Sequence, residues 1–363
     1  MQSSNSFKES LSLAFNIPVI PENRRYWLVR THSGDYYQDF VDGNFIAIDS
    51  KISQDMIEKA LEQEKYKKVL KEKIEQEFPN EERPGLLAGY IANIIYEMQA
   101  GDVILIPSKD SKVIAFGEVE ISPAYFETAE SMARREYRNK DHVRKIVCPY
   151  TLRRRVRWVK FVSKGELDLH LIKAFFSHNT ISSIDQYGYT IDRTLNTLFI
   201  KGNELHYKLK ITRKDPIPMS VYFELMESIK ILADEFNESS KEYKCDFDQI
   251  TIKMQAESPG FGELITLIPQ IVNIASDHPY LLFGFPIILF ISVLVVGGKL
   301  KIPFLKYETP GLLSQIFEWY KYNQEHKTLG TKKFENAYKK LQDNDPKKDN
   351  VLPLPKADES NKN

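Results

Sequence analysis

Basic residues gather in one part of an otherwise neutral chain, between Arg134 and Lys164. This segment holds twelve lysines and arginines against two acidic residues, whereas the whole chain has 50 Lys+Arg and 50 Asp+Glu. A polyanion would gain free energy here by counterion release, and Tyr137, Tyr150 and Trp158 add flat surfaces for base stacking. The segment therefore favours a nucleic acid or a nucleotide as partner. The competing interpretation is a solvated loop followed by strands whose arginines pair with acids elsewhere.

The sequence lacks the residue patterns that are typical of catalytic and metal sites. Its seven histidines are isolated, and there is no Walker-type phosphate loop, nucleophile elbow or dinucleotide-binding turn. The chain has only two cysteines, Cys148 and Cys245, which lie far apart in sequence. This number excludes a disulfide framework and a Cys-rich zinc site. Asp246, Asp248 and Lys253 cluster around an expected strand, and exposed positions at the start of a strand explain them more simply than a metal site. We predict no enzymatic activity, no metal and no cofactor.

A short polar segment, Ser177-His178-Asn179-Thr180, is a second candidate for ligand contact. Its hydroxyl and amide groups could hydrogen-bond the edge of a base. They could equally well begin a helix or stabilise a turn, since these residue types are common at both places. We favour the role in a turn or helix cap.

Short strands with helices between them are expected in the first part of the chain. Strands are predicted over 26–31, 45–48, 103–107, 113–121, 155–161, 197–201 and 204–212, and helices over 52–77 and 84–98. Alternation along the fifth strand puts Val156 and Trp158 on one face, so Trp158 is either core or the floor of a pocket. Trp27 poses the same question, and for both the core is the safer interpretation. The pattern predicts a small, closed or nearly closed β-barrel.

The run Asp215-Pro216-Ile217-Pro218 marks a domain boundary. Beyond it, the sequence predicts a helix over 219–243, a strand over 249–255 and an amphipathic helix over 312–324. We expect an α+β protein with an N-terminal extension (1–20), a recognition domain (21–213), a smaller α+β domain (214–342) and a disordered tail (343–363).

Residues 279–298 form a strongly apolar run of 20 residues without a charge. A helix of this length is just long enough to cross about 30 Å of hydrocarbon. We expect a transmembrane helix here, although a buried helix or an oligomer core gives the same pattern. The first residues lack a secretory signal, so the N-terminal domain is expected in the cytoplasm, associated with the inner membrane through 279–298. Lysines follow this segment, and the positive-inside rule places them in the cytoplasm, so a cytoplasmic N-terminal domain needs an even number of crossings. The uncharged stretch 264–276 is too short for a normal span but could form an interfacial or re-entrant leg. The alternatives are a single crossing that disobeys the rule and insertion only on activation.

Six stretches resemble a PUA-like or EVE-type domain, in the version found at the N-terminus of Mrr-type restriction proteins. They are YWLVRT at 26–31, SGDYYQDFVDGNFIAI at 33–48, RPGLLAGYIANIIYEMQAGDVILIPSKDSKVIAFGEVE at 83–120, RRRVRWVKFV at 153–162, SHNTISSI at 177–184 and LNTLFIKG at 195–202. Their order and spacing carry the resemblance, which covers about 20–212. It implies a β-barrel that recognises a modified or flipped base, or RNA, in a pocket between strands, without chemistry of its own.

The resemblance also suggests which residues would meet the ligand. A base pocket needs aromatic walls, hydrogen-bond partners for the base edge, and basic groups for phosphates. The candidates are Trp27, Phe40, Phe45 and Trp158 for the walls, Arg30, Asp35 and Asn44 for polar contacts, and Arg153, Arg155 and Arg157 for phosphates.

Mrr-type proteins continue into a nuclease whose metal site uses spaced carboxylates and a lysine, a pattern we do not find after residue 213. We therefore expect a bacterial defence-type sensor, in which the PUA-like domain binds nucleic acid or a nucleotide. The C-terminal domain, vaguely like membrane-linked defence effectors, would act at the membrane or by forming homo-oligomers. One alternative is a restriction-type DNA-binding protein with a degenerate or cryptic nuclease half. Another is an interaction subunit that oligomerises through 279–298.

Overall fold

The computed structural model of the protein describes residues 8–9, 12, 16–139, 146–239, 247–254, 260–267, 288, 291 and 311–342. The chain divides into two compact units, one formed by 21–196 and the other by 1–20 together with 197–363. The boundary therefore lies after residue 196 and not after 213 as expected. The two strands between these positions were assigned to the wrong unit, because they pair with residues 19–20 and 260–267.

The unit formed by 21–196 is built on one mixed sheet. Its strands are β2 (Tyr26–Val29), β3 (Phe45–Ile48), β4 (Val103–Pro107), β5 (Val113–Val119), β6 (Tyr125–Phe126), β7 (Leu152–Ser163) and β8 (Ile181–Ser183). The strand order is β3-β7-β5-β4-β2-β8, and β6 also pairs with β7. Strands β2 and β4 run parallel, and the other pairs are antiparallel.

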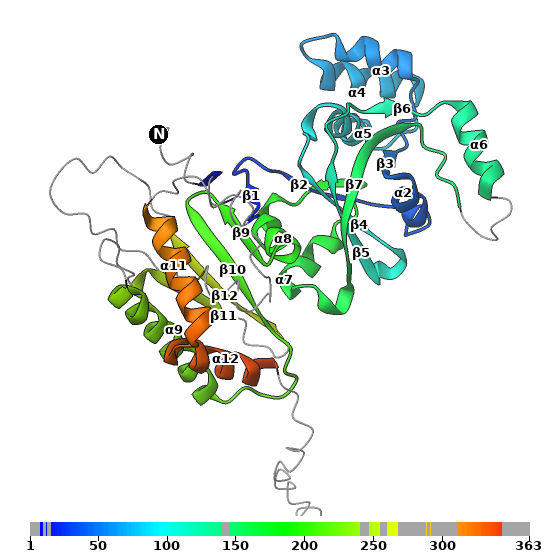
Figure 1. The fold of residues 1–363 in the computed structure, drawn as a ribbon. Coiled ribbons are helices and arrows are strands. Elements are labelled where there is room, and N and C mark those ends of the chain that lie inside the picture. Colours follow the sequence, from blue (N-terminus) through cyan, green and yellow to red (C-terminus); the bar gives the residue numbers. More distant parts are fainter. Residues whose placement is uncertain are drawn as a thin grey trace, which may run out of the picture. The chain divides into compact units, whose positions relative to one another are not determined.

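The sheet curls into a half-barrel, with the long strand β7 bending across it (Figure 1). The register between β5 and β7 shifts at Phe116 and Gly117, and such a bulge strengthens the local twist. Glycine is required at 117, since a Cβ there would lie 2.4 Å from Val156 Cγ1. The outer strands β3 and β8 are not paired with each other in the described part of the chain, so the barrel that we expected to be closed or nearly closed is open.

Helices cover both faces of this sheet. On one face, Ile57 of α3 (Gln54–Leu61), Leu70 of α4 (Tyr66–Glu77) and Ile91 of α5 (Pro84–Ala92) share a core with Trp27 and Ile104. On the other face, Leu171 of α7 (Leu169–Ile172) and Ile191 of α8 (Gly188–Leu195) pack with Leu28 and Leu105. Burial on both sides explains why β2 and β4 are continuous apolar runs without alternation.

The remaining helical segments of this unit are short. They are α2 (Tyr37–Gly43), α6 (Ala129–Asn139), the π-helix η1 (Asn93–Glu97) and the 3-10 helices η2 (Lys109–Ser111), η3 (Lys164–Glu166), η4 (Lys173–Phe176) and η5 (Asp185–Tyr187). The helix expected over 52–77 is two helices, α3 and α4, that are separated by residues 62–65. The helix expected over 84–98 is confirmed as α5, which continues into η1.

The second unit has a sheet of five strands in the order β1-β9-β10-β12-β11. These are β1 (Val19–Ile20), β9 (Leu198–Lys201), β10 (Glu204–Ile211), β11 (Ile250–Met254) and β12 (Gly260–Leu267), with the 3-10 helix η6 (Phe247–Gln249) before β11. Helices α9 (Met219–Ser239), α11 (Gly311–His326) and α12 (Leu329–Gln342) pack on it (Figure 1). Leu225, Trp319 and Phe334 of these helices form a core with Tyr207 and Leu264. Strand β12 and helix α12 were not predicted.

The mixed α+β class is confirmed, but the transmembrane helix that we included in the fold class is not supported. No helix in the described ranges is long and apolar enough to span a membrane. Within 279–298 the structure describes only Ile288 and Ile291, and both are helical and fully buried in the core of the second unit. Residues 264–267, expected as part of an interfacial leg, belong to β12. The other residues of both segments, and the expected tail 343–363, lie outside the described residues.

Candidate ligand-binding site

The aromatic residues expected to form pocket walls lie mostly in the core of the half-barrel. Trp27, Phe40 and Phe45 are each at most 1% exposed, so they cannot contact a ligand without rearrangement of the core. The Phe40 and Phe45 rings pack 5.1 Å apart. Trp158 is half-buried, and its indole N–H donates to the carbonyl oxygen of Phe40 over 3.1 Å. These four aromatic residues stabilise the fold in this structure.

Arg153 is also a core residue, although we expected it to hold a phosphate. Its side chain is 0% exposed and forms an ion pair with Glu127 at 2.7 Å. Its guanidinium also donates to the carbonyl oxygens of Tyr150, at 2.9 Å, and Cys148, at 3.2 Å. The same group stacks on Phe45, 4.1 Å from the ring centroid. These contacts lie inside the protein and the side chain is not accessible, so Arg153 cannot hold a phosphate in this structure.

The other arginines of β7 divide between the two faces. Arg154 is buried and donates to the Met98 carbonyl oxygen over 3.2 Å, and burial lowers the pKa of its guanidinium. Arg155 and Arg157 are exposed, and Arg157 forms an ion pair with Glu118. Arg155 lies over the Tyr125 ring at 5.1 Å. Of the three arginines expected to hold phosphates, Arg155 and Arg157 are thus accessible.

The three polar candidates lie in different surroundings. Asp35 is exposed on the loop before α2 and contacts His32 at 3.4 Å. Asn44 is exposed at the C-terminal end of α2, where its positive φ of 52° ends the helix. Arg30 donates from Nε to the Ser177 carbonyl oxygen over 3.1 Å, and from Nη2 to the carbonyl oxygens of Phe175 and Ser177. Burial lowers the pKa of the Arg30 guanidinium.

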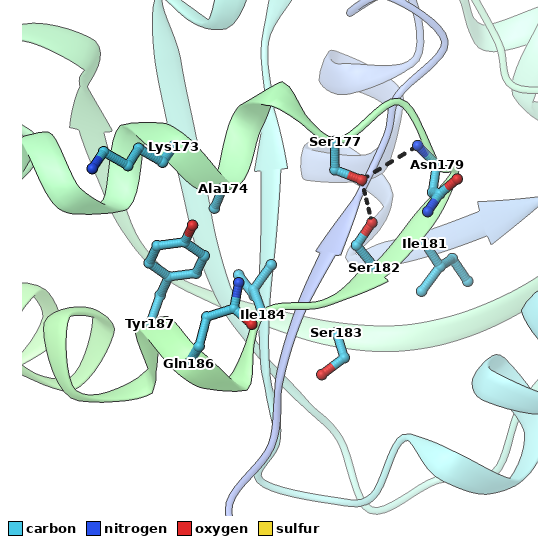
Figure 2. Close-up of a pocket in the computed structure, with 10 residues that line it drawn as sticks. All are labelled: Lys173, Ala174, Ser177, Asn179, Ile181, Ser182, Ser183, Ile184, Gln186 and Tyr187. Carbon is cyan, nitrogen blue, oxygen red and sulfur yellow. Dashed lines mark hydrogen bonds between the residues drawn. The ribbon is translucent and has the colours of Figure 1, made fainter.

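The segment held by Arg30 forms a wall of a pocket of about 400 Å³. The pocket is lined by η4, β8, η5 and the turn between η4 and β8 (Figure 2). Its lining residues are Lys173, Ala174, Ser177, Asn179, Ile181, Ser182, Ser183, Ile184, Gln186 and Tyr187. The pocket belongs entirely to the unit formed by 21–196, and six of its ten lining residues come from the stretch SHNTISSI.

Hydrogen bonds fix both ends of the turn that joins η4 to β8. Arg30 holds its first residues, and the Thr180 N–H donates to the Tyr90 hydroxyl oxygen over 3.1 Å at its end. Inside the turn, the hydroxyl oxygens of Ser177 and Ser182 lie 2.6 Å apart, and the Asn179 N–H donates to Ser177 Oγ over 3.4 Å (Figure 2). The pocket wall is therefore held in place by the residues of the half-barrel.

The pocket combines an apolar floor with polar groups that are available to a ligand. Ala174 and Ile184 are apolar and buried in the core on the α7 and α8 side of the sheet, whereas Ile181 is buried in the core on the other side. Lys173 is exposed and has no ion pair among the residues that the structure describes. Asn179 and Gln186 are exposed, and their side chains likewise form no hydrogen bond within the described ranges. A flat, partly apolar molecule with an anionic group fits these surroundings.

The described lining of the pocket contains no Asp, Glu, His or Cys. It therefore offers no carboxylate or imidazole for acid–base chemistry and no cluster of metal ligands. No group of three or more such residues that could hold a metal ion occurs elsewhere in the described part of the chain. Of the metal candidates weighed in the sequence, Asp246 lies outside the described residues. Asp248 belongs to η6 and Lys253 is exposed on β11.

Comparison with known proteins relates the first unit to one domain family. A family model described as "Domain of unknown function (DUF8426)" matches residues 25–185. No curated protein and no solved structure matched the chain. The matched range lies within the unit formed by 21–196, and it includes every pocket residue except Gln186 and Tyr187, which follow directly.

Proposed function

We propose that the unit formed by 21–196 binds a nucleotide, free or within a nucleic acid, in the pocket lined by 173–187. The observation that carries this proposal is an available cation, Lys173, at a pocket with an apolar floor and a tyrosine side chain. A base would lie against Ile184 and Tyr187, while Lys173 meets a phosphate. Pockets of a few hundred Å³ with a few polar groups are typical of small-molecule sites.

Two further features support a nucleotide as the ligand. The resemblance to PUA-like domains implies a base-binding module, and its SHNTISSI stretch supplies most of the pocket lining. Exposed Arg155 and Lys164 on and after β7 would add attraction for a longer nucleic acid through counterion release. The absence of carboxylates, imidazoles and thiols from the described lining favours binding without catalysis. A role in bacterial defence, in which the second unit acts as the effector by forming homo-oligomers, stays a prediction.

The proposal predicts that Lys173→Ala weakens binding of nucleotides more than binding of nucleosides. We expect the parent protein to bind at least one of the four ribonucleoside 5′-monophosphates more tightly than the matching nucleoside. Loss of the ammonium group should lower the monophosphate affinity about tenfold, which corresponds to ~1.4 kcal/mol for a charged hydrogen bond at a partly exposed site. The nucleoside affinity should change by less than about twofold. Titration calorimetry with the full chain measures both.

The matched control is Lys73→Ala, since Lys73 is exposed on α4 and lies outside the pocket lining and the basic part of β7. This variant should bind monophosphates as the parent does. A single-stranded RNA and a single-stranded DNA oligonucleotide distinguish a free nucleotide from a nucleic acid as the natural ligand. Failure of the parent to bind any of these probes, or equal losses for the two lysine variants, would contradict the proposal.

A further inference from the structure

Strand β8 is an outer strand of the sheet, and its backbone orientation follows from two hydrogen bonds. The Arg30 N–H donates to the Thr180 carbonyl oxygen over 2.8 Å, and the Ile184 N–H donates to the Tyr26 carbonyl oxygen over 2.8 Å. In an antiparallel pair, residues that exchange hydrogen bonds alternate with residues that point their N–H and C=O groups away. Residues 180, 182 and 184 therefore face β2, in agreement with the pairing of Leu28 with Ser182.

The backbone groups of Ile181 and Ser183 consequently point away from β2. Both residues line the pocket. Among the described residues β8 pairs with β2 alone, so no strand covers these four groups, whereas the Ser183 hydroxyl donates to Asp185 Oδ2 over 2.8 Å. Exposed Ser183 thus presents an N–H donor and a C=O acceptor at the pocket.

A third hydrogen-bonding group comes from the two serines of the pocket wall. The Ser177 and Ser182 hydroxyls share one hydrogen bond, for which either can be the donor. Two hydroxyls carry two hydrogens, so one O–H stays available whichever of them donates. The pocket therefore offers hydrogen-bond donors and an acceptor at its β8 side, opposite Lys173 and Tyr187 (Figure 2).

We propose that the outward-facing backbone N–H and C=O of Ser183 read the hydrogen-bonding edge of a nucleobase in this pocket. This inference rests on the proposed nucleotide binding and specifies how the base is recognised. Each unmodified base has a donor and an acceptor side by side on its Watson–Crick edge, which complements the N–H and C=O of one strand residue. A peptide strand is the less suitable occupant, because β8 is only three residues long and η5 follows it almost at once.

The first test compares the best-bound monophosphate with a form methylated on this edge. The forms are N3-methyl for uridine, N1-methyl for guanosine, N6,N6-dimethyl for adenosine and N4,N4-dimethyl for cytidine. We expect methylation to weaken binding to the parent protein three- to tenfold, since a neutral hydrogen bond contributes about that factor. Equal affinity for the methylated and unmethylated nucleotides would overturn the inference.

The second test removes the Ser183 N–H by Ser183→Pro. Proline is tolerated on an edge strand where the N–H points outward, so this variant should fold with a melting temperature close to that of the parent. It should bind the unmethylated nucleotide three- to tenfold more weakly and discriminate less against the methylated one. The matched control is Ser182→Pro, which removes an inward N–H and should lower the melting temperature strongly.

The outcomes separate the inference from the proposal on which it rests. A parent protein that binds no nucleotide contradicts both. Nucleotide binding that is weakened by Lys173→Ala but unaffected by edge methylation contradicts the backbone reading alone. Unfolding of Ser183→Pro to the same extent as Ser182→Pro would show that the Ser183 N–H faces β2, and would also overturn the inference.

Discussion

Arg153→Ala is expected to destabilise the first unit by about 3–5 kcal/mol. The substitution deletes a fully buried guanidinium and leaves Glu127, whose side chain is 13% exposed, without its ion-pair partner. It also removes the donors to the carbonyl oxygens of Tyr150 and Cys148 and the contact with the Phe45 ring. Removing one partner of a buried pair typically costs this much, because the other charge stays buried. Urea unfolding followed by tryptophan fluorescence measures the loss.

Arg155→Ala is the matched control, two residues further along the same strand. Its side chain is exposed and lies over the Tyr125 ring, so its loss should change the free energy of unfolding by less than about 1 kcal/mol. Similar stabilities of the two variants would show that Arg153 is not buried as described.

Asp102→Asn is expected to destabilise the same unit by about 2–4 kcal/mol. Asp102 is 4% exposed and precedes β4. Its Oδ2 accepts from the Trp27 indole N–H over 3.0 Å and from the Gln99 N–H over 2.9 Å, while Oδ1 accepts from the Arg25 N–H over 3.1 Å. Asparagine replaces one of the two carboxylate oxygens by an NH2 group, which is itself a donor. At least one of the three N–H groups would therefore lose its acceptor. Each buried polar group left unpaired costs about 1–3 kcal/mol.

The control for this prediction is Asp55→Asn. Asp55 is largely exposed on α3 and pairs with Lys59 at 2.7 Å, an interaction that contributes little in water. Its loss should change the urea midpoint only slightly. An Asp102→Asn variant as stable as Asp55→Asn would contradict the three hydrogen bonds assigned to Asp102.

The elements that the sequence predicted well are those with strong local signals. Strands β2, β4 and β5 are apolar runs next to turns, and α5 begins with Pro84 at its first position. The unit boundary was misplaced because the hairpin of β9 and β10 looks alike in either unit. Its assignment depends on pairing with β12, which is distant in sequence and whose second half lies in the stretch 264–276, expected as an interfacial leg.

The candidate site shows why residue type alone was misleading. Arg153 and Arg155 are identical in type and lie on one strand, but their neighbours in space bury one and expose the other. Aromatic residues such as Trp27 and Phe45 suit a base pocket and a core equally well. The polar stretch at Ser177 forms the turn that we expected, with the Asn179 N–H donating to Ser177 Oγ, and residues of the same stretch also line the pocket. Lys173 and Tyr187 had no pattern that distinguishes them from other helical residues.

Hydrogen–deuterium exchange of the full chain, with and without a saturating ribonucleoside 5′-monophosphate, tests the central claim most directly. Backbone amides gain protection where a ligand covers or hydrogen-bonds them. If the nucleotide occupies the pocket, exchange should slow across residues 173–187, with the Ser183 amide included, and should stay unchanged in β7. Protection confined to 152–163, or no protection anywhere at a saturating concentration, would contradict the account.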